Sequence, residues 1–210
     1  MKTGKMALLV LAGMSYIFLS RILATLLPGL FGGPFRAGLH LLVSFLASLT
    51  VLFFYVYFRR YYLKSSETVL DKASVIRIIG ASAVSLLYLK AFFILRGRSV
   101  MYSDSFDLFI PWVDSIIALY FFYVFYRYGL SEGRAGLKTA IMLAVAGSAL
   151  LVLIRTAVMI NYLYQQESVW LWDHIREHPF IFLPVQVFIF FTAFYFYFTF
   201  YREQRAGESA

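Results

Sequence analysis

Six apolar runs, each long enough to cross a membrane, constrain the fold of this chain more than any other feature. A spanning helix needs about 20 mostly apolar residues, and six such runs take up most of the 210 residues. Only 14% of the residues are charged, whereas soluble domains are about a quarter charged. A soluble core could not hide that much apolar surface. The sequence therefore predicts an all-α integral membrane protein with six transmembrane helices in a single membrane domain.

Short clusters of glycine, proline and polar residues separate the runs. The first run follows Lys2 and Lys5 as a signal peptide would, but it is longer than a usual signal segment and lacks a clear cleavage site, so we expect it to remain as a helix. The longest connection, residues 165–178, contains tryptophans typical of the headgroup level and is a candidate surface helix. The expected helices span residues 6–30, 38–58, 73–95, 106–126, 137–162 and 179–201.

The cations outside the centres of the runs are distributed unevenly between the two sides of the membrane. Twelve fall on the side that holds both termini and four on the other side. The positive-inside rule then places both termini in the cytoplasm, which suits a protein of the cell inner (plasma) membrane. We therefore interpret the net charge of +8 as a topology signal and not as a nucleic-acid surface. The twelve are Lys2, Lys5, Arg59, Arg60, Lys64, Lys72, Arg77, Arg127, Arg134, Lys138, Arg202 and Arg205, and the four are Arg36, Arg96, Arg98 and Arg176.

Two patterns occur three times in the same order. A cluster of small residues is followed within the apolar run by a cation, and an aromatic run that stops at an arginine comes later. Internal repeats of this kind indicate duplication, with parallel copies related by an axis along the membrane normal. Positive-inside loops and aromatic belts can also produce such similarity without duplication. We predict three two-helix repeats around a pseudo-threefold axis: residues 1–64, 65–133 and 134–210, with cations at Arg21, Lys90 and Arg155 and aromatic runs ending at Arg59, Arg127 and Arg202.

The small residues and the bulky aromatics lie on alternate helices. Helices associate in lipid where small residues let their backbones approach. The first, third and fifth helices carry those small residues, and the second, fourth and sixth carry the aromatics. We therefore expect an inner cluster of the odd helices and an outer layer of the even ones. A sequential six-helix bundle remains the alternative.

The three cations inside the runs suggest a binding site. Arg21, Lys90 and Arg155 each lie about 16 to 18 residues beyond a cytoplasmic lysine, which corresponds to roughly 25 Å along a helix and to the outer part of the membrane core. They could converge on an outward-facing cavity that holds an anion. They could equally extend to the outer headgroups, as long basic side chains near helix ends do.

Asp114 is the one acid deep inside a run, and an intramembrane acid is a functional candidate with an expected partner. Lys90 precedes it on the neighbouring helix, so we predict an ion pair between Lys90 and Asp114. Such a pair can lock two helices together, which is the simpler interpretation because buried pairs are often structural. It can also act as a proton- or ligand-sensitive switch.

The histidines are weak metal candidates. His174 and His178 are four positions apart, a spacing that can bind zinc on a helix, although a polar face at the headgroups explains it as well. A haem held by His40 with one of them is conceivable, but no haem motif is present. The absence of cysteine excludes thiolate sites, and no catalytic motif is found. We therefore predict no cofactor and do not expect an enzyme.

Three functions remain open. The first is binding or translocation of an anionic ligand, a lipid headgroup or a small organic anion, by Arg21, Lys90 and Arg155 with Asp114 tuning the charge. The second is a non-catalytic structural subunit that packs against other membrane proteins or against further copies of itself. The third is a haem- or metal-binding membrane protein. In each case the lipid bilayer is the surrounding partner, and no nucleic acid is expected.

Overall fold

The computed structural model describes residues 2–26, 34–63, 68–95, 104–129, 135–165 and 179–206. Apart from Leu63, Thr68 and Gly129 the chain is helical in these ranges, with six helices long and apolar enough to cross a membrane. The protein is therefore a polytopic membrane protein by the length and composition of its helices. The long helices are α1 (Lys2–Leu26), α3 (Pro34–Tyr57), α4 (Val69–Leu95), α5 (Asp104–Tyr128), α6 (Ala135–Gln165) and α8 (Pro179–Ala206).

Most helices extend beyond the apolar runs that predict them. The backbone needs hydrogen-bond partners wherever lipid replaces water, and continuing a helix supplies them. Residues 59–62, which follow the expected end of the second helix, belong to a π-helical turn, η1 (Phe58–Tyr62), that prolongs α3. Similarly, α8 continues to Ala206. The proposed surface helix after Gln165 lies outside the described residues.

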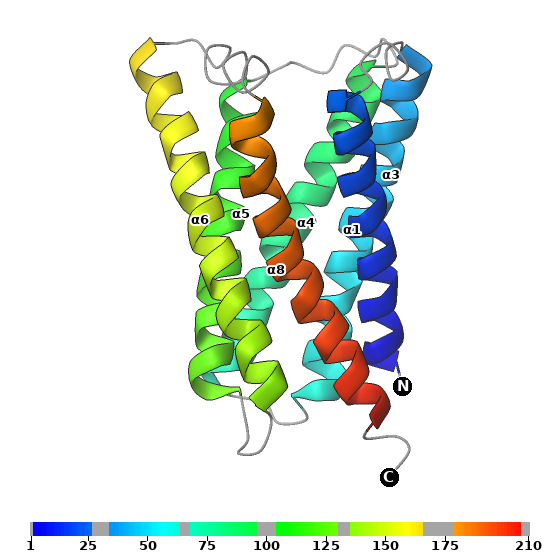
Figure 1. Ribbon diagram of the computed structural model, residues 1–210, viewed down its shortest axis with the longest axis vertical. Coiled ribbons are helices and arrows are strands. Elements are labelled where there is room, and N and C mark those ends of the chain that lie inside the picture. The colour runs from blue at the N-terminus through cyan, green and yellow to red at the C-terminus, as the bar shows by residue number, and fades with distance from the viewer. Residues whose placement is uncertain are drawn as a thin grey trace.

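The six helices form a closed ring in chain order (Figure 1). Each helix packs against the one before and the one after it, and α1 packs against α8. The start of α1 and the end of α8 lie at the same end of the ring (Figure 1). The expected inner cluster of odd helices is wrong, because α1, α4 and α6 alternate with the other three around the ring. Short connections make consecutive helices neighbours, which favours this sequential arrangement.

The small residues mediate contacts between consecutive helices and do not gather on a common axis. The pairs, called hairpins below, are α1 with α3, α4 with α5 and α6 with α8. A Cβ atom added to Gly13 of α1 would lie 2.9 Å from the Cβ of Ala47 on α3. One added to Gly80 of α4 would lie 2.8 Å from Oδ1 of Asp114 on α5. One added to Gly147 of α6 would overlap the side chain of Thr192 on α8. The three glycines therefore let the two helices of each pair approach closely, as small residues do in membrane helices.

Six phenylalanines, the aromatic cluster, fill the ring at the end that holds both termini. They come from α3 with η1, from α5 and from α8, and each is at most 1% exposed. Their rings interlock at centroid distances of 5.3 Å for Phe54 and Phe200, 5.7 Å for Phe58 and Phe121, and 6.1 Å for Phe125 and Phe196. The expectation that the even helices form an outer aromatic layer is therefore wrong for these residues. Large rings gain most by filling the space that a ring of helices encloses.

Candidate binding site

A cavity of about 310 Å³ lies in the middle of the ring and is lined by residues from all six helices. This volume is at the lower end of the ~300–1,000 Å³ of typical small-molecule sites. Its floor is formed by Tyr55, Phe122 and Tyr197, which adjoin the aromatic cluster; for example, the rings of Phe122 and Phe196 are 4.9 Å apart. Towards the other end the lining reaches Tyr88 and Arg155. The cavity is thus closed by aromatic rings on the side of the termini.

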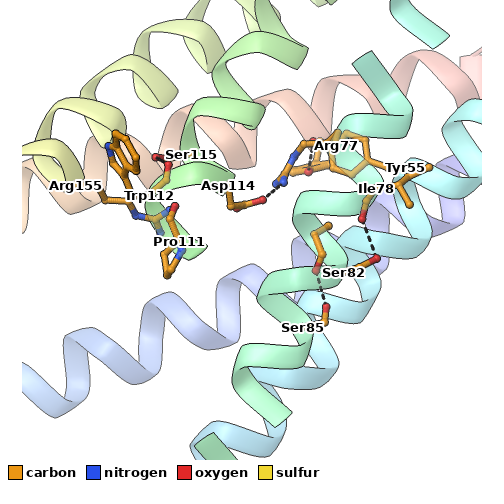
Figure 2. A network of polar contacts seen from close by, with 12 residues as sticks. Tyr55, Arg77, Ile78, Ser82, Ser85, Pro111, Trp112, Asp114, Ser115 and Arg155 are labelled. Atoms are coloured by element: carbon orange, nitrogen blue, oxygen red, sulfur yellow. Dashed lines mark hydrogen bonds and ion pairs between the residues drawn. The ribbon is translucent and has the colours of Figure 1, made fainter. Parts of the chain in front are cut away.

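An ion pair between α4 and α5 dominates one wall of the cavity. Arg77 is 8% exposed, and its Nη1 donates a hydrogen bond to Oδ1 of Asp114 (Figure 2). The Arg77 guanidinium also lies over the ring of Tyr55, with its carbon 5.0 Å from the ring centroid, a favourable cation–π arrangement. The hydroxyl oxygens of Tyr55 and Tyr197 are 3.2 Å apart. The cation is therefore held by a carboxylate and by the floor of the cavity.

The predicted ion pair between Lys90 and Asp114 is wrong, because Arg77 is the residue that pairs with Asp114. Lys90 lies 13 residues beyond Arg77 on α4, which is about 20 Å along the helix. It is not among the lining residues. Arg77, in turn, does not flank the membrane as the cation count assumed: it lies within α4 and is buried. Hydropathy locates an apolar run but fixes the depth of a residue only to about a turn or two.

One atom of Arg77 lacks a partner. Among the described residues, Nε of Arg77 is the one buried side-chain nitrogen or oxygen without a hydrogen bond. Leaving a buried donor unsatisfied costs about 1–3 kcal/mol, and more for a charged group. Nε itself is closed off from solvent, but other atoms of Arg77 line the cavity, so a small shift of this side chain would let an acceptor atom of a bound molecule satisfy the donor. The arrangement is suited to holding an acceptor, and in particular an anionic one.

Arg155 reaches the same cavity from the other side of α5. It lies on α6, lines the cavity, and its Nη1 donates a hydrogen bond to the carbonyl oxygen of Pro111 (Figure 2). One position further along each helix, Nε1 of Trp112 donates to Oγ1 of Thr156 at 2.9 Å. Two arginines from α4 and α6 therefore flank α5 within about one helical turn.

Of the residues that the sequence analysis selected, Arg155 and Asp114 line the cavity, whereas Lys90 does not. The side chain of Arg21 lies outside the described residues. Sequence reasoning missed Arg77, Tyr55 and Tyr197 as members of the site. A signal for Arg77 was nevertheless present in the sequence, because Arg77 lies three positions before Gly80. The residues three positions before the other two glycines are apolar, namely Val10 before Gly13 and Ala144 before Gly147.

The histidines fall away from this cavity or beyond the described part of the chain. Nδ1 of His40 on α3 lies 3.3 Å from Oγ of Ser20 on α1, and His40 is not among the lining residues. His174 and His178 lie outside the described residues. Within the ranges that the structure describes, no three acidic or histidine residues gather in a group that could hold a metal ion. The prediction of no cofactor, with zinc and haem binding as weak alternatives, stays untested.

Comparison with known proteins gives no further assignment. No protein-family model matches the chain, and no curated protein and no solved structure shows significant similarity to it. Its function is therefore inferred from the cavity and the side chains that line it.

Proposed function

We propose that this membrane protein binds a small anionic molecule in its central cavity and passes it across the membrane. The observation that carries the proposal is the Arg77 side chain: it lines a cavity large enough for a small molecule, and its buried Nε is a cationic donor without a hydrogen-bond partner. The described lining residues include two arginines and one carboxylate. A bound anion would both satisfy the donor and lower the electrostatic cost of burying positive charge.

We also propose that the three hairpins are repeats in a register set by their glycines. Gly13, Gly80 and Gly147 are each 67 positions apart, and each stands where its helix meets the next one in the chain. Three of the six ring pairs between helices in the aromatic cluster support this register. Replacing α3 by α5, α5 by α8 and α8 by α3 exchanges the pairs Phe54–Phe200, Phe58–Phe121 and Phe125–Phe196, whereas the other three pairs are not all related in this way. In this register, the position equivalent to Arg21 and Arg155 is Tyr88 and not Lys90.

The proposed register separates a structural role of the ion pair from a functional one. Arg77 corresponds to Val10 and Ala144, which are 0% and 2% exposed, and Asp114 corresponds to Ala47, which is 6% exposed. Two of the three hairpins thus pack with apolar residues where the second has charges. A buried ion pair often stabilises no more than apolar residues would. We therefore propose that the charges of the second repeat serve to bind the ligand and not to stabilise the fold.

The cation distribution supports an orientation for this site. Without the buried Arg77, eleven cations remain on the side of the termini against four on the other, which still favours cytoplasmic termini in the inner membrane. The aromatic cluster would then close the cavity towards the cytoplasm. A ligand would enter from outside, and passage would require the cluster to open.

The proposal can be tested by thermal unfolding of the protein in lipid nanodiscs, with 4-methylpentanoate and its uncharged amide as probes. The acid should raise the melting temperature by several degrees at concentrations far above its Kd, because it binds only the folded state. The amide should have little effect. Lys90→Gln is the control, and its response to the acid should match that of the unmodified protein. Equal effects of acid and amide, or no effect of either, would contradict anion binding.

Passage is measured separately in proteoliposomes as exchange of radiolabelled 4-methylpentanoate against internal unlabelled acid. We expect a saturable component that empty liposomes lack. Exchange that rises linearly with concentration and equals that of empty liposomes would contradict passage, since a weak acid also leaks through lipid.

A further inference from the structure

The lining of the cavity also contains hydrogen-bond acceptors. Hydroxyls of two lining serines donate their single proton to their own helix, Ser48 to the carbonyl of Phe45 at 2.7 Å and Ser115 to that of Trp112 at 2.6 Å. A hydroxyl that has donated its proton still has lone pairs and can only accept. A bound molecule can therefore form hydrogen bonds with these two serines only through its own donor groups, and not through a second anionic oxygen.

Asp114 adds a stronger acceptor at the same place. Its side chain is 15% exposed and lines the cavity. An ionised carboxylate has about four lone-pair sites, and the bond from Arg77 uses one of them. Asp114, an anionic acceptor on α5, thus lies beside the guanidinium of Arg77 on α4, and both residues line the cavity (Figure 2).

Apolar side chains form much of the remaining wall. Met14, Ile17, Val51, Val84 and Leu151 line the cavity from four helices. A hydrated inorganic anion would gain nothing from them, whereas a short hydrocarbon skeleton would be removed from water. The volume of about 310 Å³ corresponds to the liquid volume of roughly ten water molecules, so the skeleton must be short.

Building on the proposed function, we infer that the ligand is a small organic acid with a hydroxyl or ammonium group next to its anionic group. The anionic group accepts a hydrogen bond from Nε of Arg77. The adjacent hydroxyl or ammonium donates to Asp114. The hydrocarbon part packs against the apolar wall. A molecule of this class offers an acceptor to Arg77 and a donor to Asp114. A simple anion or an unsubstituted fatty acid offers the acceptor but has no donor for Asp114.

Three probes with one carbon skeleton test the inference: 4-methylpentanoate, 2-hydroxy-4-methylpentanoate and leucine, the last two as both enantiomers. Their dissociation constants are measured by calorimetry on the protein in nanodiscs. At least one substituted acid should bind about tenfold or more tightly than the parent acid, as expected for an added charge-assisted hydrogen bond. The preferred substituent identifies the donor as hydroxyl or ammonium. If the parent acid binds as tightly as every substituted one, the inference is wrong while anion binding stands. If no acid binds, the proposed function itself fails.

A variant assigns the preference to its acceptor. Asp114→Asn should reduce the advantage of the substituted acid to less than about threefold, because a neutral amide oxygen makes a weaker bond. Ser82→Ala is the control. The Ser82 hydroxyl donates to the carbonyl of Ile78 on α4 at 2.9 Å, as the lining serines donate to their own helices, but Ser82 does not line the cavity. The preference of this variant for the substituted acid should therefore stay unchanged. An unaltered preference in Asp114→Asn would overturn the assignment to Asp114. Should that variant fail to fold, the three-probe comparison on the unmodified protein still decides the ligand class.

Discussion

Asp114→Ala is expected to lower the free energy of unfolding by about 3–5 kcal/mol, because it leaves the Arg77 guanidinium buried without its counter-charge. Arg77→Val should destabilise the protein by a similar amount, because it leaves the Asp114 carboxylate buried without its counter-charge. The double variant Arg77→Val/Asp114→Ala, in contrast, should lie within about 1 kcal/mol of the unmodified protein, since buried pairs are often replaced by apolar residues at no net cost. Equilibrium unfolding of all four proteins in mixed detergent micelles measures these differences as a double-mutant cycle.

The double variant copies into the second hairpin the residues of the first. Val10 and Ala47 occupy the matching places there and are 0% and 6% exposed, so the backbone already accommodates this pair beside a glycine. Strictly additive losses, with the double variant weaker than either single one, would contradict both the proposed register and the functional reading of the charges. A stable double variant should no longer respond to carboxylate probes, which separates binding from folding.

Arg77→Lys is expected to weaken binding of the carboxylate probe by roughly 10- to 150-fold, the equivalent of one lost hydrogen bond to a charged group of about 1.5–3 kcal/mol. Lysine keeps the positive charge and can still pair with Asp114. It has no second, rigidly placed donor that corresponds to Nε, because its ammonium is a single point charge. The substitution therefore removes the unpartnered donor and retains the counter-ion.

Calorimetry with 2-hydroxy-4-methylpentanoate measures this loss, and the melting temperature of the ligand-free variant reports on folding. Lys90→Arg is a matched control at a cation outside the cavity lining and should leave affinity within about twofold, well under 1.4 kcal/mol. If Arg77→Lys binds as tightly as the unmodified protein, its Nε does not contact the ligand.

Hydropathy was sufficient to predict six spanning helices, since an apolar run of about 20 residues in a weakly charged chain has few other ways to bury its surface. It did not predict how the helices pack. Small residues indicate that two backbones approach closely, but not which two, and Gly13, Gly80 and Gly147 each face the next helix of their own hairpin. The order of the ring follows from short connections.

The residues that line the cavity were predicted in part, for a similar reason. Asp114 and Arg155 stand out in sequence because they are charged and deep within an apolar run, and both line the cavity. Arg77 was assigned to the membrane surface because it stands near the start of its run, in a region where lysines and arginines normally lie in the headgroups. The aromatic residues Tyr55 and Tyr197 resemble an interfacial belt in sequence, and only the packing of α3 and α8 in the ring places them on the floor of the cavity.

The most direct test of the central claim is whether a ligand protects the cavity from chemical modification. The chain contains no cysteine, so Ser148→Cys places a single thiol, isosteric with the native hydroxyl, on the cavity wall. Leu153→Cys on the same helix is the control, because Leu153 is 67% exposed on the outside of the ring and a thiol facing lipid does not ionise readily. Labelling is measured with a small membrane-impermeant thiosulfonate.

We expect the reagent to modify Ser148→Cys and not Leu153→Cys, and 2-hydroxy-4-methylpentanoate to slow the reaction about tenfold or more at concentrations at least ten times its Kd. The protection should disappear when Arg77→Lys is added. Labelling of Ser148→Cys that is unaffected by any of the three acids, or protection that persists without the arginine, would contradict an anion-binding cavity centred on Arg77.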